Sequence, residues 1–444
     1  MSSRGRALRI LAWAALILAV AYFLWRGVWR GNGDQGDLAV GFSAARAWLL
    51  GHDPYDVAVL NHDLFLAGGA NLANSSLLEH LRNVYFPATL PVFVPLALVS
   101  WPEAKVLALL INVGASLFIA LGLGHLLGWR LTSSKALALT AFVLALAPVH
   151  TTIADGQTGL VATAAVVAAM LLERSGRGTA SGVMYGLATA IKIQIGLPFV
   201  AYLLWRRRWA PALASCSTLV GLTVLSVVRM QVAAAPWLSG WLTNMSWLSR
   251  PGGINDPSVQ NPDRFTLINL QYPLSTLIAN AALVELMTLT VVGVAALAFI
   301  WLRRGRDPHP DLLSLAVVAV LGLLVAYHRY YDAVLLAIPI AWACSAIGTP
   351  RWRQGVVVLA LCADFTLPFQ SALNSFQQRG ILPSWLTGGV FWNAVVLAQF
   401  AWALVLMASV LLVAAARDRQ HVPRSELGDP PAGRPGLPRL AQTP

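Results

Sequence analysis

Residues 280–302 read NAALVELMTLTVVGVAALAFIWL, a run that is almost entirely apolar. A helix needs about 20 mostly apolar residues to cross the hydrocarbon core of a membrane. This stretch has the length and the composition for one crossing, so it predicts a transmembrane helix. The rest of the chain decides whether this helix is a single anchor or one span of a larger bundle.

Further stretches of similar composition lie along the whole chain. They are residues 8–26, 104–128, 135–150, 157–173, 209–231, 312–327, 331–348, 355–371 and 390–416. Shorter or broken apolar pieces lie at 86–100, 180–191 and 194–205. If 180–191 and 194–205 each cross as short helices, the pattern predicts an all-α polytopic membrane protein with about 12 transmembrane helices. The proline-bearing piece 86–100 is predicted to be re-entrant or interfacial.

The composition indicates the same fold class. Of the 444 residues, 57% are hydrophobic and only 11% are charged, whereas soluble proteins carry roughly 25% charged residues. Most of this surface must therefore face lipid, which excludes a cytosolic enzyme, a secreted disulfide scaffold and an intrinsically disordered chain. The three cysteines each lie in an apolar run and are interpreted as small buried hydrophobes.

The net charge of +12 is interpreted as the result of basic residues in cytoplasmic loops, so no nucleic-acid partner is predicted. Lys and Arg in short loops mark the cytoplasmic side of a membrane protein. The basic loops hold Arg174 and Arg177, Arg206 to Arg208, Arg303 to Arg306, Arg351 and Arg353, and Arg417 and Arg419. Placing these loops inside puts two long loops, residues 27–85 and 232–272, on the outer face of the membrane.

The two ends of the chain fit this topology. Arg4, Arg6 and Arg9 precede an apolar run with no small-residue cleavage site after it, which predicts an uncleaved first span with its N-terminus inside. Residues 417–444 are polar and proline-rich and are predicted to form a disordered cytoplasmic tail. Residues 1–416 then form one transmembrane domain, placed in the inner or plasma membrane of the cell.

Asp37 is the first candidate functional residue. Ionisable side chains at membrane depth or at the membrane edge are costly, and so each one is a hypothesis about function. Asp37 opens a predicted amphipathic segment, residues 37–50, just after the first span. A carboxylate there could act as a general base on a hydroxyl group; the alternative is a helix N-cap. Asp34 is an equally placed candidate on spacing alone.

Lys192 and the segment His328 to Asp332 are the next candidates. Lys192 has apolar sequence on both sides, so it needs a partner anion such as phosphate, a water-filled cavity or a route to the interface. His328 could relay a proton or bind phosphate, and Arg329 could clamp an anion. The alternative for this segment is an ordinary charged loop between helices.

Two polar turns and one outer loop give weaker signals. Gln157 ends the triplet Asp155-Gly156-Gln157, which could line a cavity or form a plain loop. Tyr55 belongs to the turn signature at residues 52–56, whose polar groups could bind a substrate or serve the turn alone. Polar residues of the second outer loop suit a sugar, namely Arg250, Asn255, Asp256, Asn261, Asp263 and Arg264.

Two kinds of site are not predicted. The sequence has no DxD triad and no His/Cys cluster, so neither a metal nor another cofactor is expected. It also lacks a Walker A motif, which argues against an ATP-driven pump.

Taken together, these stretches resemble glycosyltransferase family 87, the polyprenyl-phosphate-mannose-dependent alpha-(1→2)-mannosyltransferase group of the GT-C superfamily. The resemblance covers about residues 35–345. It is carried by Asp37 with residues 50–56 (LGHDPYD), 85–91 (YFPATLP), 156–160 (GQTGL), the helix 182–192 that ends in lysine, and the loop 328–332. The sequence departs from the family pattern where paired prolines become Pro87-Ala88 and where a tryptophan normally leads the histidine loop.

The resemblance implies a GT-C-like fold with long outer loops and a reaction at the outer face. Such enzymes transfer a sugar from a polyprenyl-phosphate donor, with inversion at the anomeric carbon. Asp37 then matches the catalytic base, while Lys192, His328 and Arg329 match groups around the donor phosphate. Gln157 and Tyr55 are expected to bind substrate. The expected donor sugar is a hexose, mannose in the first place although related enzymes also use arabinofuranose, and the expected acceptor is a glycolipid or a glycan.

Two other functions fit the composition. A transporter or flippase of lipid-linked sugars also needs buried charges and broken helices, but it should show internal repeats and short loops. This sequence shows neither a repeat nor short outer loops, which favours an external active site. A structural or assembly subunit would not need Lys192 or the outer acids.

Overall fold

The computed structural model describes residues 3–33, 35–75, 77–304, 311–325 and 327–420. The helices are α1 Ser3–Phe23, α2 Gly36–Leu50, α3 Val57–Leu66, α4 Leu90–Ala97, α5 Trp101–Leu126, α6 Ser134–Ala145, α7 Ala147–Asp155, α8 Gly159–Arg174, α9 Gly178–Ile191, α10 Ile193–Trp205, α11 Trp209–Val232, α12 Trp237–Ser249, α13 Gln271–Leu277, α14 Ala281–Arg303, α15 Leu312–Val325, α16 Ala337–Ala346, α17 Trp352–Ala363, α18 Phe369–Gln378, α19 Ser384–Thr387 and α20 Gln399–Gln420. Short 3₁₀ and π segments adjoin them, among them η1 Leu24–Trp29, η3 Pro87–Thr89 and η5 Tyr330–Leu336. No strand occurs in these described ranges, so the all-α prediction is confirmed.

The helices long enough to cross a membrane make this a multi-pass membrane protein. Five stretches are long and apolar enough, namely Gly5–Trp29, α5, α11, α14 and Gln399–Asp418. Two bent pairs, α6 with α7 at 50° and Trp352–Thr366 with α18 at 43°, raise the number to as many as seven. The predicted count of about 12 is not confirmed, because α8, α9, α10 and α15 have only 13 to 16 residues each.

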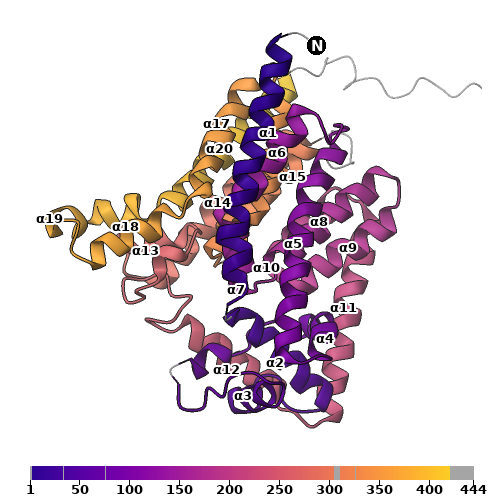
Figure 1. The fold of residues 1–444 in the computed structure, drawn as a ribbon, viewed down its shortest axis with the longest axis vertical. Helices are drawn as coiled ribbons and strands as arrows, with labels where there is room; N and C mark the ends of the chain where they lie inside the picture. Colours follow the sequence, from indigo (N-terminus) through magenta and orange to yellow (C-terminus); the bar gives the residue numbers. More distant parts are fainter. Residues whose placement is uncertain (1–2, 34, 76, 305–310, 326, 421–444) are drawn as a thin grey trace, which may run out of the picture.

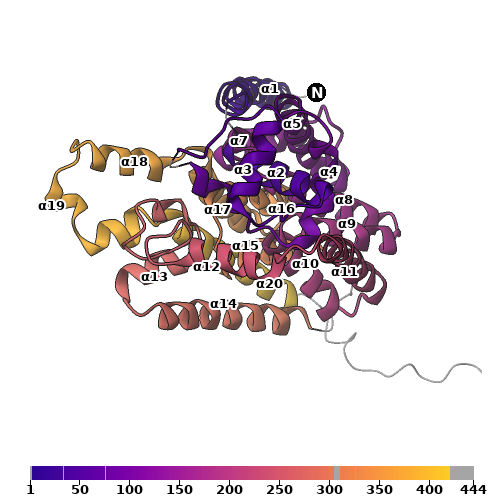
Figure 2. The same ribbon diagram turned by 90° about the horizontal axis from the view of Figure 1, so that it is seen from below.

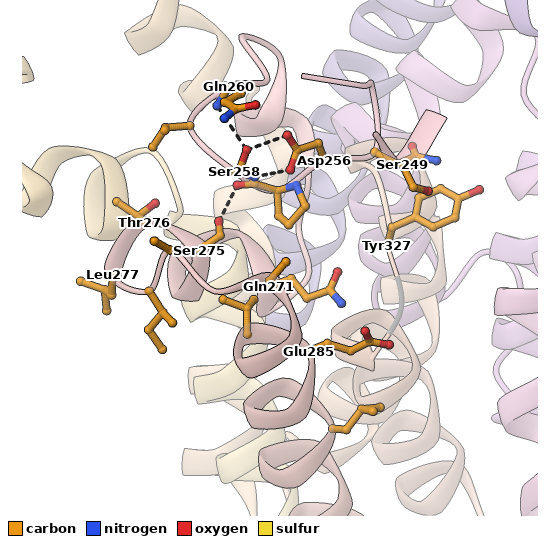
Figure 3. Close-up of a pocket in the computed structure, with 18 of the residues that line it drawn as sticks. Ser249, Asp256, Ser258, Gln260, Gln271, Ser275, Thr276, Leu277, Glu285 and Tyr327 are labelled. Carbon is orange, nitrogen blue, oxygen red and sulfur yellow. Dashed lines mark hydrogen bonds between the residues drawn. The ribbon is translucent and has the colours of Figure 1, made fainter. Parts of the chain in front are cut away.

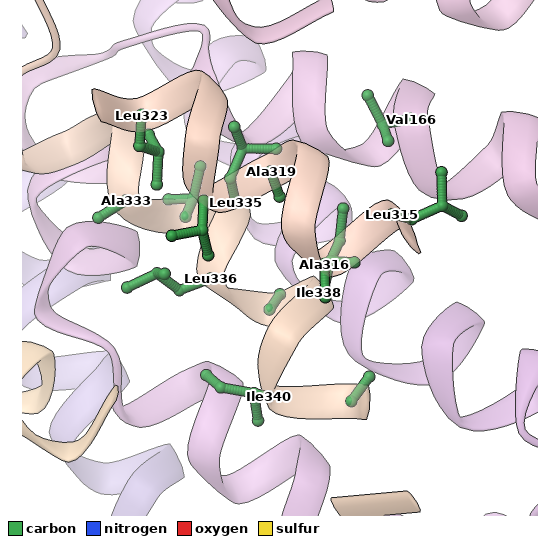
Figure 4. Close-up of a cluster of buried hydrophobic side chains, with 14 of the residues drawn as sticks. Val166, Leu315, Ala316, Ala319, Leu323, Ala333, Leu335, Leu336, Ile338 and Ile340 are labelled. Carbon is green, nitrogen blue, oxygen red and sulfur yellow. The ribbon is translucent and has the colours of Figure 1, made fainter. Parts of the chain in front are cut away.

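Burial separates the outer helices from the inner ones. In the spans of α1, α11 and α14 only 17%, 22% and 22% of the most apolar window is buried, so their apolar side chains point outward, as lipid contact requires. By contrast, α15 is buried along nearly its whole length. Figure 4 shows its side chains, such as Leu315 and Leu323, packed with those of η5 and α16, such as Leu335 and Ile338. This is the centre of the hydrophobic core.

The end of the bundle that lies away from the N-terminus is built from α2, α3, α4 and α12 (Figure 1). These helices belong to the predicted outer loops 27–85 and 232–272 and to the piece 86–100. On another side of the bundle, α18 and α19 project outward (Figures 1 and 2). The predicted outer loops therefore contain helices of their own, α2 and α3 in the first and α12 in the second.

The segment 37–50 and the piece 86–100 both lie at this end of the molecule. The segment 37–50 is a helix, but it is not amphipathic: Leu38 to Ala45, Ala47 and Trp48 are all buried, because α3, α4 and α5 surround it. In the piece 86–100, η3 and α4 form only a short apolar helix, Pro87–Ala97. At about 1.5 Å per residue this helix is much shorter than a membrane core of roughly 30 Å, so its re-entrant or interfacial position stays a prediction.

The predicted boundary of the transmembrane domain at residue 416 lies inside a helix, since α20 continues to Gln420. Residues 421–444 of the predicted disordered tail lie outside the described residues.

Candidate active site

A cavity of about 790 Å³ lies where α2, the α7–α8 turn, the junction of α9 and α10, α12 and the segment after α15 meet. We call it the Asp37 cavity. Four of the six residues predicted to form the site line it, namely Asp37, Gln157, Lys192 and Arg329. Asp155, from the polar triplet noted in the sequence, lines it as well. His328 and Tyr55 lie behind its walls.

Gln157 connects Asp37, the candidate base, to Lys192, the candidate phosphate-binding residue. Its Nε2 donates a hydrogen bond to Asp37 Oδ2 at 2.6 Å. Its Oε1 accepts one from Lys192 Nζ at 3.2 Å. The amide therefore turns its donor toward the carboxylate and its acceptor toward the ammonium, which is the only orientation that satisfies both charges. The Gln157 amide therefore holds the Asp37 carboxylate and the Lys192 ammonium on one wall of the cavity.

A buried ion pair lies beneath this wall. Lys192 Nζ is 2.5 Å from Asp332 Oδ1, and both side chains are almost fully buried. Asp332 Oδ2 lies 3.0 Å from His328 Nδ1. The ammonium also lies 4.4 Å from the centre of the Tyr331 ring. A lysine removed from water needs such a counterion, so Asp332 explains why Lys192 is tolerated in an apolar sequence.

Lys192 is placed by a break between two helices. Its extended backbone (φ −151°, ψ 97°) ends α9 and begins α10, and the two helices pack on each other. The close approach requires glycine at position 196, where a Cβ would lie 2.3 Å from the backbone nitrogen of Thr189. The reversal leaves Lys192 at the cavity, with Gln194 beside it on the cavity wall.

Gln157 is placed by a glycine turn. Gly156 has φ +68°, a left-handed conformation that favours glycine. A Cβ at this position would also lie only 2.6 Å from Leu38 Cβ. Glycine therefore lets the α7–α8 turn press against α2, which brings Gln157 next to Asp37.

Asp37 itself does not cap its helix. The N-cap position of α2 is Gln35, and Asp37 lies in the first turn, so the N-cap alternative does not apply. Its Oδ2 accepts the bond from Gln157, and no described residue donates to its other oxygen. That oxygen is therefore available as a hydrogen-bond acceptor. The rival candidate Asp34 lies outside the described residues.

Tyr55 supports the cavity wall from behind. Its hydroxyl donates to the backbone oxygen of Tyr85 at 3.0 Å, and Tyr85 lines the cavity. Burial, and next the Asp53 carboxylate, raise the pKa of the Tyr55 phenol far above its usual range, so the group stays a donor at physiological pH. Asn244 of α12 donates to the backbone oxygen of Tyr55 and ties the two outer segments together.

Several residues of an aromatic and basic wall, namely Arg82, Trp241 and Trp247, were not singled out from the sequence. Tyr85, Phe86, Trp241 and Trp247 line the Asp37 cavity. Arg82 and Arg250 also line it, and their guanidinium groups lie 4.8 and 4.4 Å from the centre of the Trp247 ring. The signal for this wall was the tryptophan-rich composition of 237–249, which equally suits residues at a membrane interface.

Histidine, cysteine and carboxylate side chains do not gather into a metal site in the described part of the chain, where no group of three or more could hold an ion.

The fold and the cavity define a multi-pass membrane protein with a polar, charged cavity at one end of an apolar helix bundle. The family model described as Glycosyltransferase family 87 matches residues 83–326, which is more than half of the chain. The protein therefore belongs to glycosyltransferase family 87 and is a membrane glycosyltransferase. Comparison with curated proteins and comparison with solved structures gave no match.

The matched range covers only part of the cavity. It includes Gln157 and Lys192, whereas Asp37 precedes it and His328 and Arg329 follow it. The contacts of Gln157 and Lys192 connect these outlying residues to the matched part of the chain.

Proposed function

We propose that this glycosyltransferase transfers a hexose, mannose in the first place, from a polyprenyl-phosphate donor to a glycolipid or glycan acceptor. The reaction takes place at the outer face of the membrane and inverts the anomeric carbon. The observation that carries the proposal is the linked set Asp37–Gln157–Lys192 on the wall of one cavity. It holds a base and a cation on the same wall, which are the two groups this transfer needs.

Asp37 is the proposed general base. Its unbonded oxygen takes the proton of the acceptor hydroxyl as the hydroxyl oxygen attacks the anomeric carbon. The bond between that carbon and the phosphate oxygen breaks, and both of its electrons leave with the polyprenyl phosphate. Gln157 holds the other carboxylate oxygen, so the unbonded oxygen keeps its direction during the transfer.

The cations are proposed to stabilise the departing phosphate. Lys192 and Arg329 both line the cavity. One terminal nitrogen of Arg329 donates a hydrogen bond to the backbone oxygen of Ile254, at 2.8 Å, which fixes the guanidinium group beside the cavity. Fixed donors of this kind stabilise developing negative charge because they need no reorganisation at the moment of reaction. His328 is a positioning residue, since it reaches the cavity only through Asp332 and Lys192.

The aromatic wall is proposed to receive the sugars. Tyr85 and Trp241 line the same cavity as Asp37. Aromatic rings carry an apolar face and a polar edge group, and so they suit sugar rings, which are apolar on their C–H faces and polar at their hydroxyls. The cavity volume of about 790 Å³ lies within the range that small-ligand sites usually have.

The proposal is tested with Asp37→Asn in purified protein supplied with a radiolabelled polyprenyl-phosphate hexose. We expect kcat to fall by at least about 100-fold, because a general base contributes roughly that much, while the melting temperature stays near that of the wild type. Glu103→Gln is the charge-matched control, since Glu103 is exposed and does not line the cavity. Full activity of Asp37→Asn would overturn the base assignment.

The same assay separates the enzyme from a flippase. Wild-type protein should release polyprenyl phosphate in step with transfer of label to the acceptor. If it moves the donor across vesicles without releasing polyprenyl phosphate, the proposed reaction is wrong.

A further inference from the structure

A second cavity, of about 820 Å³, lies between α13, the first turns of α14 and residues 255–260. We call it the α13–α14 cavity (Figure 3). It adjoins the Asp37 cavity, because Asn255 and Tyr327 line both. It is not used by the reaction proposed above, which raises the question of what it binds.

Its walls combine hydrogen-bonding groups with apolar surface. The polar lining residues include Asn255, Asp256, Ser258, Gln271, Glu285 and Tyr327. The apolar ones include Leu277, Ala281, Val284, Leu289 and Val325. Lysine and arginine are absent from its described lining residues, whereas the Asp37 cavity is lined by several. The Asp37 cavity therefore carries charges of both signs, whereas the charged residues among the described lining of the α13–α14 cavity are carboxylates alone.

The two carboxylates of this cavity differ in their hydrogen bonding. Both Asp256 oxygens accept hydrogen bonds within their own loop, from the backbone of Gly252 and from the backbone and hydroxyl of Ser258. Glu285 is exposed and has no hydrogen-bond or ion-pair partner among the described residues. In Figure 3 the Glu285 carboxylate and the Gln271 amide lie on the side of the cavity that Tyr327 faces. Glu285 is thus an acceptor available to a ligand.

The cavity also opens on the lipid-facing side of the bundle. Glu285 lies about one turn from the start of α14, a helix long and apolar enough to span the membrane. Ala281 and Leu289 line the cavity and are themselves exposed. A ligand can therefore place a polar head against Glu285 and Gln271 and an apolar chain along α14.

These features decide the charge of the ligand. A phosphate would be repelled by Glu285 and would find no lining cation, so it belongs in the Asp37 cavity. Neutral hydroxyl groups, in contrast, donate well to an unpaired carboxylate and to an amide oxygen. We infer that the α13–α14 cavity binds a neutral, hydroxylated lipid headgroup, which is the lipid-linked acceptor. The inference rests on the proposed transferase and names the class of its acceptor.

The shared wall connects the acceptor to the base. Asn255 and Tyr327 belong to the walls of both cavities, and Gln194 lines the Asp37 cavity. A hydroxyl at the end of a headgroup in the α13–α14 cavity therefore meets a polar wall that leads to Asp37. Donor phosphate and acceptor would then approach from two sides.

Photolabelling tests the binding site without any need for catalysis. The probe is a diazirine-bearing dodecyl mannoside, used on the full-length protein in nanodiscs. We expect labelled peptides to map to residues 271–289, and Ala281→Trp to reduce this labelling by about fivefold or more. Ala282→Trp is the matched control, because Ala282 is exposed on the same turn but does not line the cavity. Equal labelling of both variants would overturn the inference.

Charge is tested with Glu285→Lys. We expect labelling by the mannoside to fall and labelling by a diazirine-bearing dodecyl phosphate to rise, each by about fivefold or more. If wild-type protein already prefers the phosphate probe at residues 271–289, the cavity holds the donor and the inference is wrong.

Kinetics separates this inference from the proposed function. In the transferase assay, Ala281→Trp should raise the KM for the lipid acceptor about tenfold and leave the KM for the donor unchanged. If wild-type protein transfers no sugar but still takes up the mannoside label at this site, the proposed function fails while the binding site stands. If transfer is normal and Ala281→Trp leaves the acceptor KM unchanged, the acceptor site is elsewhere.

Discussion

At the scale of single residues, the pairing of Lys192 with Asp332 separates folding from catalysis. Lys192→Met leaves the Asp332 carboxylate buried without its counterion, which costs roughly 3–5 kcal/mol, so the variant should melt at a clearly lower temperature. The double variant Lys192→Met with Asp332→Asn removes both charges and should regain most of the wild-type melting temperature. Neither variant should transfer sugar, because both lack the proposed phosphate ligand.

Thermal melts and the transfer assay, run side by side on both variants, check this. A double variant that stays as unstable as the single one would show that the ion pair is not what holds Lys192 in place. An active double variant would remove Lys192 from the mechanism.

At the scale of elements, the turn between α7 and α8 sets the distance between Gln157 and Asp37. Gly156→Ala adds strain from its positive φ and a contact with Leu38 that forces the turn away from α2. Gly176→Ala, in the α8–α9 turn, adds comparable φ strain (φ +76°) with no atom within 4 Å of the new Cβ. We expect Gly176→Ala to lose about 1 kcal/mol of stability from the φ strain and Gly156→Ala to lose more, because of the added contact with Leu38. Gly156→Ala alone should lose activity, by about tenfold or more.

Activity at saturating donor, measured beside melting temperature, distinguishes the two glycine variants. Comparable activity losses in both would mean that backbone strain, and not the seating of the turn on α2, causes the effect.

At the scale of the whole molecule, the sequence predicted the fold class but not the span count. Apolar runs such as 280–302 indicate a helix whatever packs around it, and α14 is that helix. In contrast, α15 is buried by its neighbours over most of its 14 residues, so its length does not report a simple crossing of lipid.

For the site, Lys192 was conspicuous as a charge in apolar sequence. Its partner Asp332 was seen only as part of a loop, because contacts between distant segments leave no local pattern.

The tryptophans of α12 gave only an ambiguous signal. Trp241 contributes to the cavity wall, but tryptophan in an outer loop fits a membrane interface equally well. The Gln157–Asp37 bond joins residues 120 positions apart, and only the packing of the α7–α8 turn on α2 brings them together.

The topology of the whole molecule can be tested by labelling single cysteines. The outer loop 27–85 and the α8–α9 turn are predicted to lie on opposite sides of the membrane, because Arg174 and Arg177 mark the turn as cytoplasmic. Asn74 and Ser175 are both exposed, and the three native cysteines are first replaced by alanine. In intact cells a membrane-impermeant maleimide should label Asn74→Cys, and it should label Ser175→Cys only after permeabilisation. Labelling of Ser175→Cys in intact cells would invert the orientation and place the Asp37 cavity on the cytoplasmic side, which would contradict a reaction at the outer face.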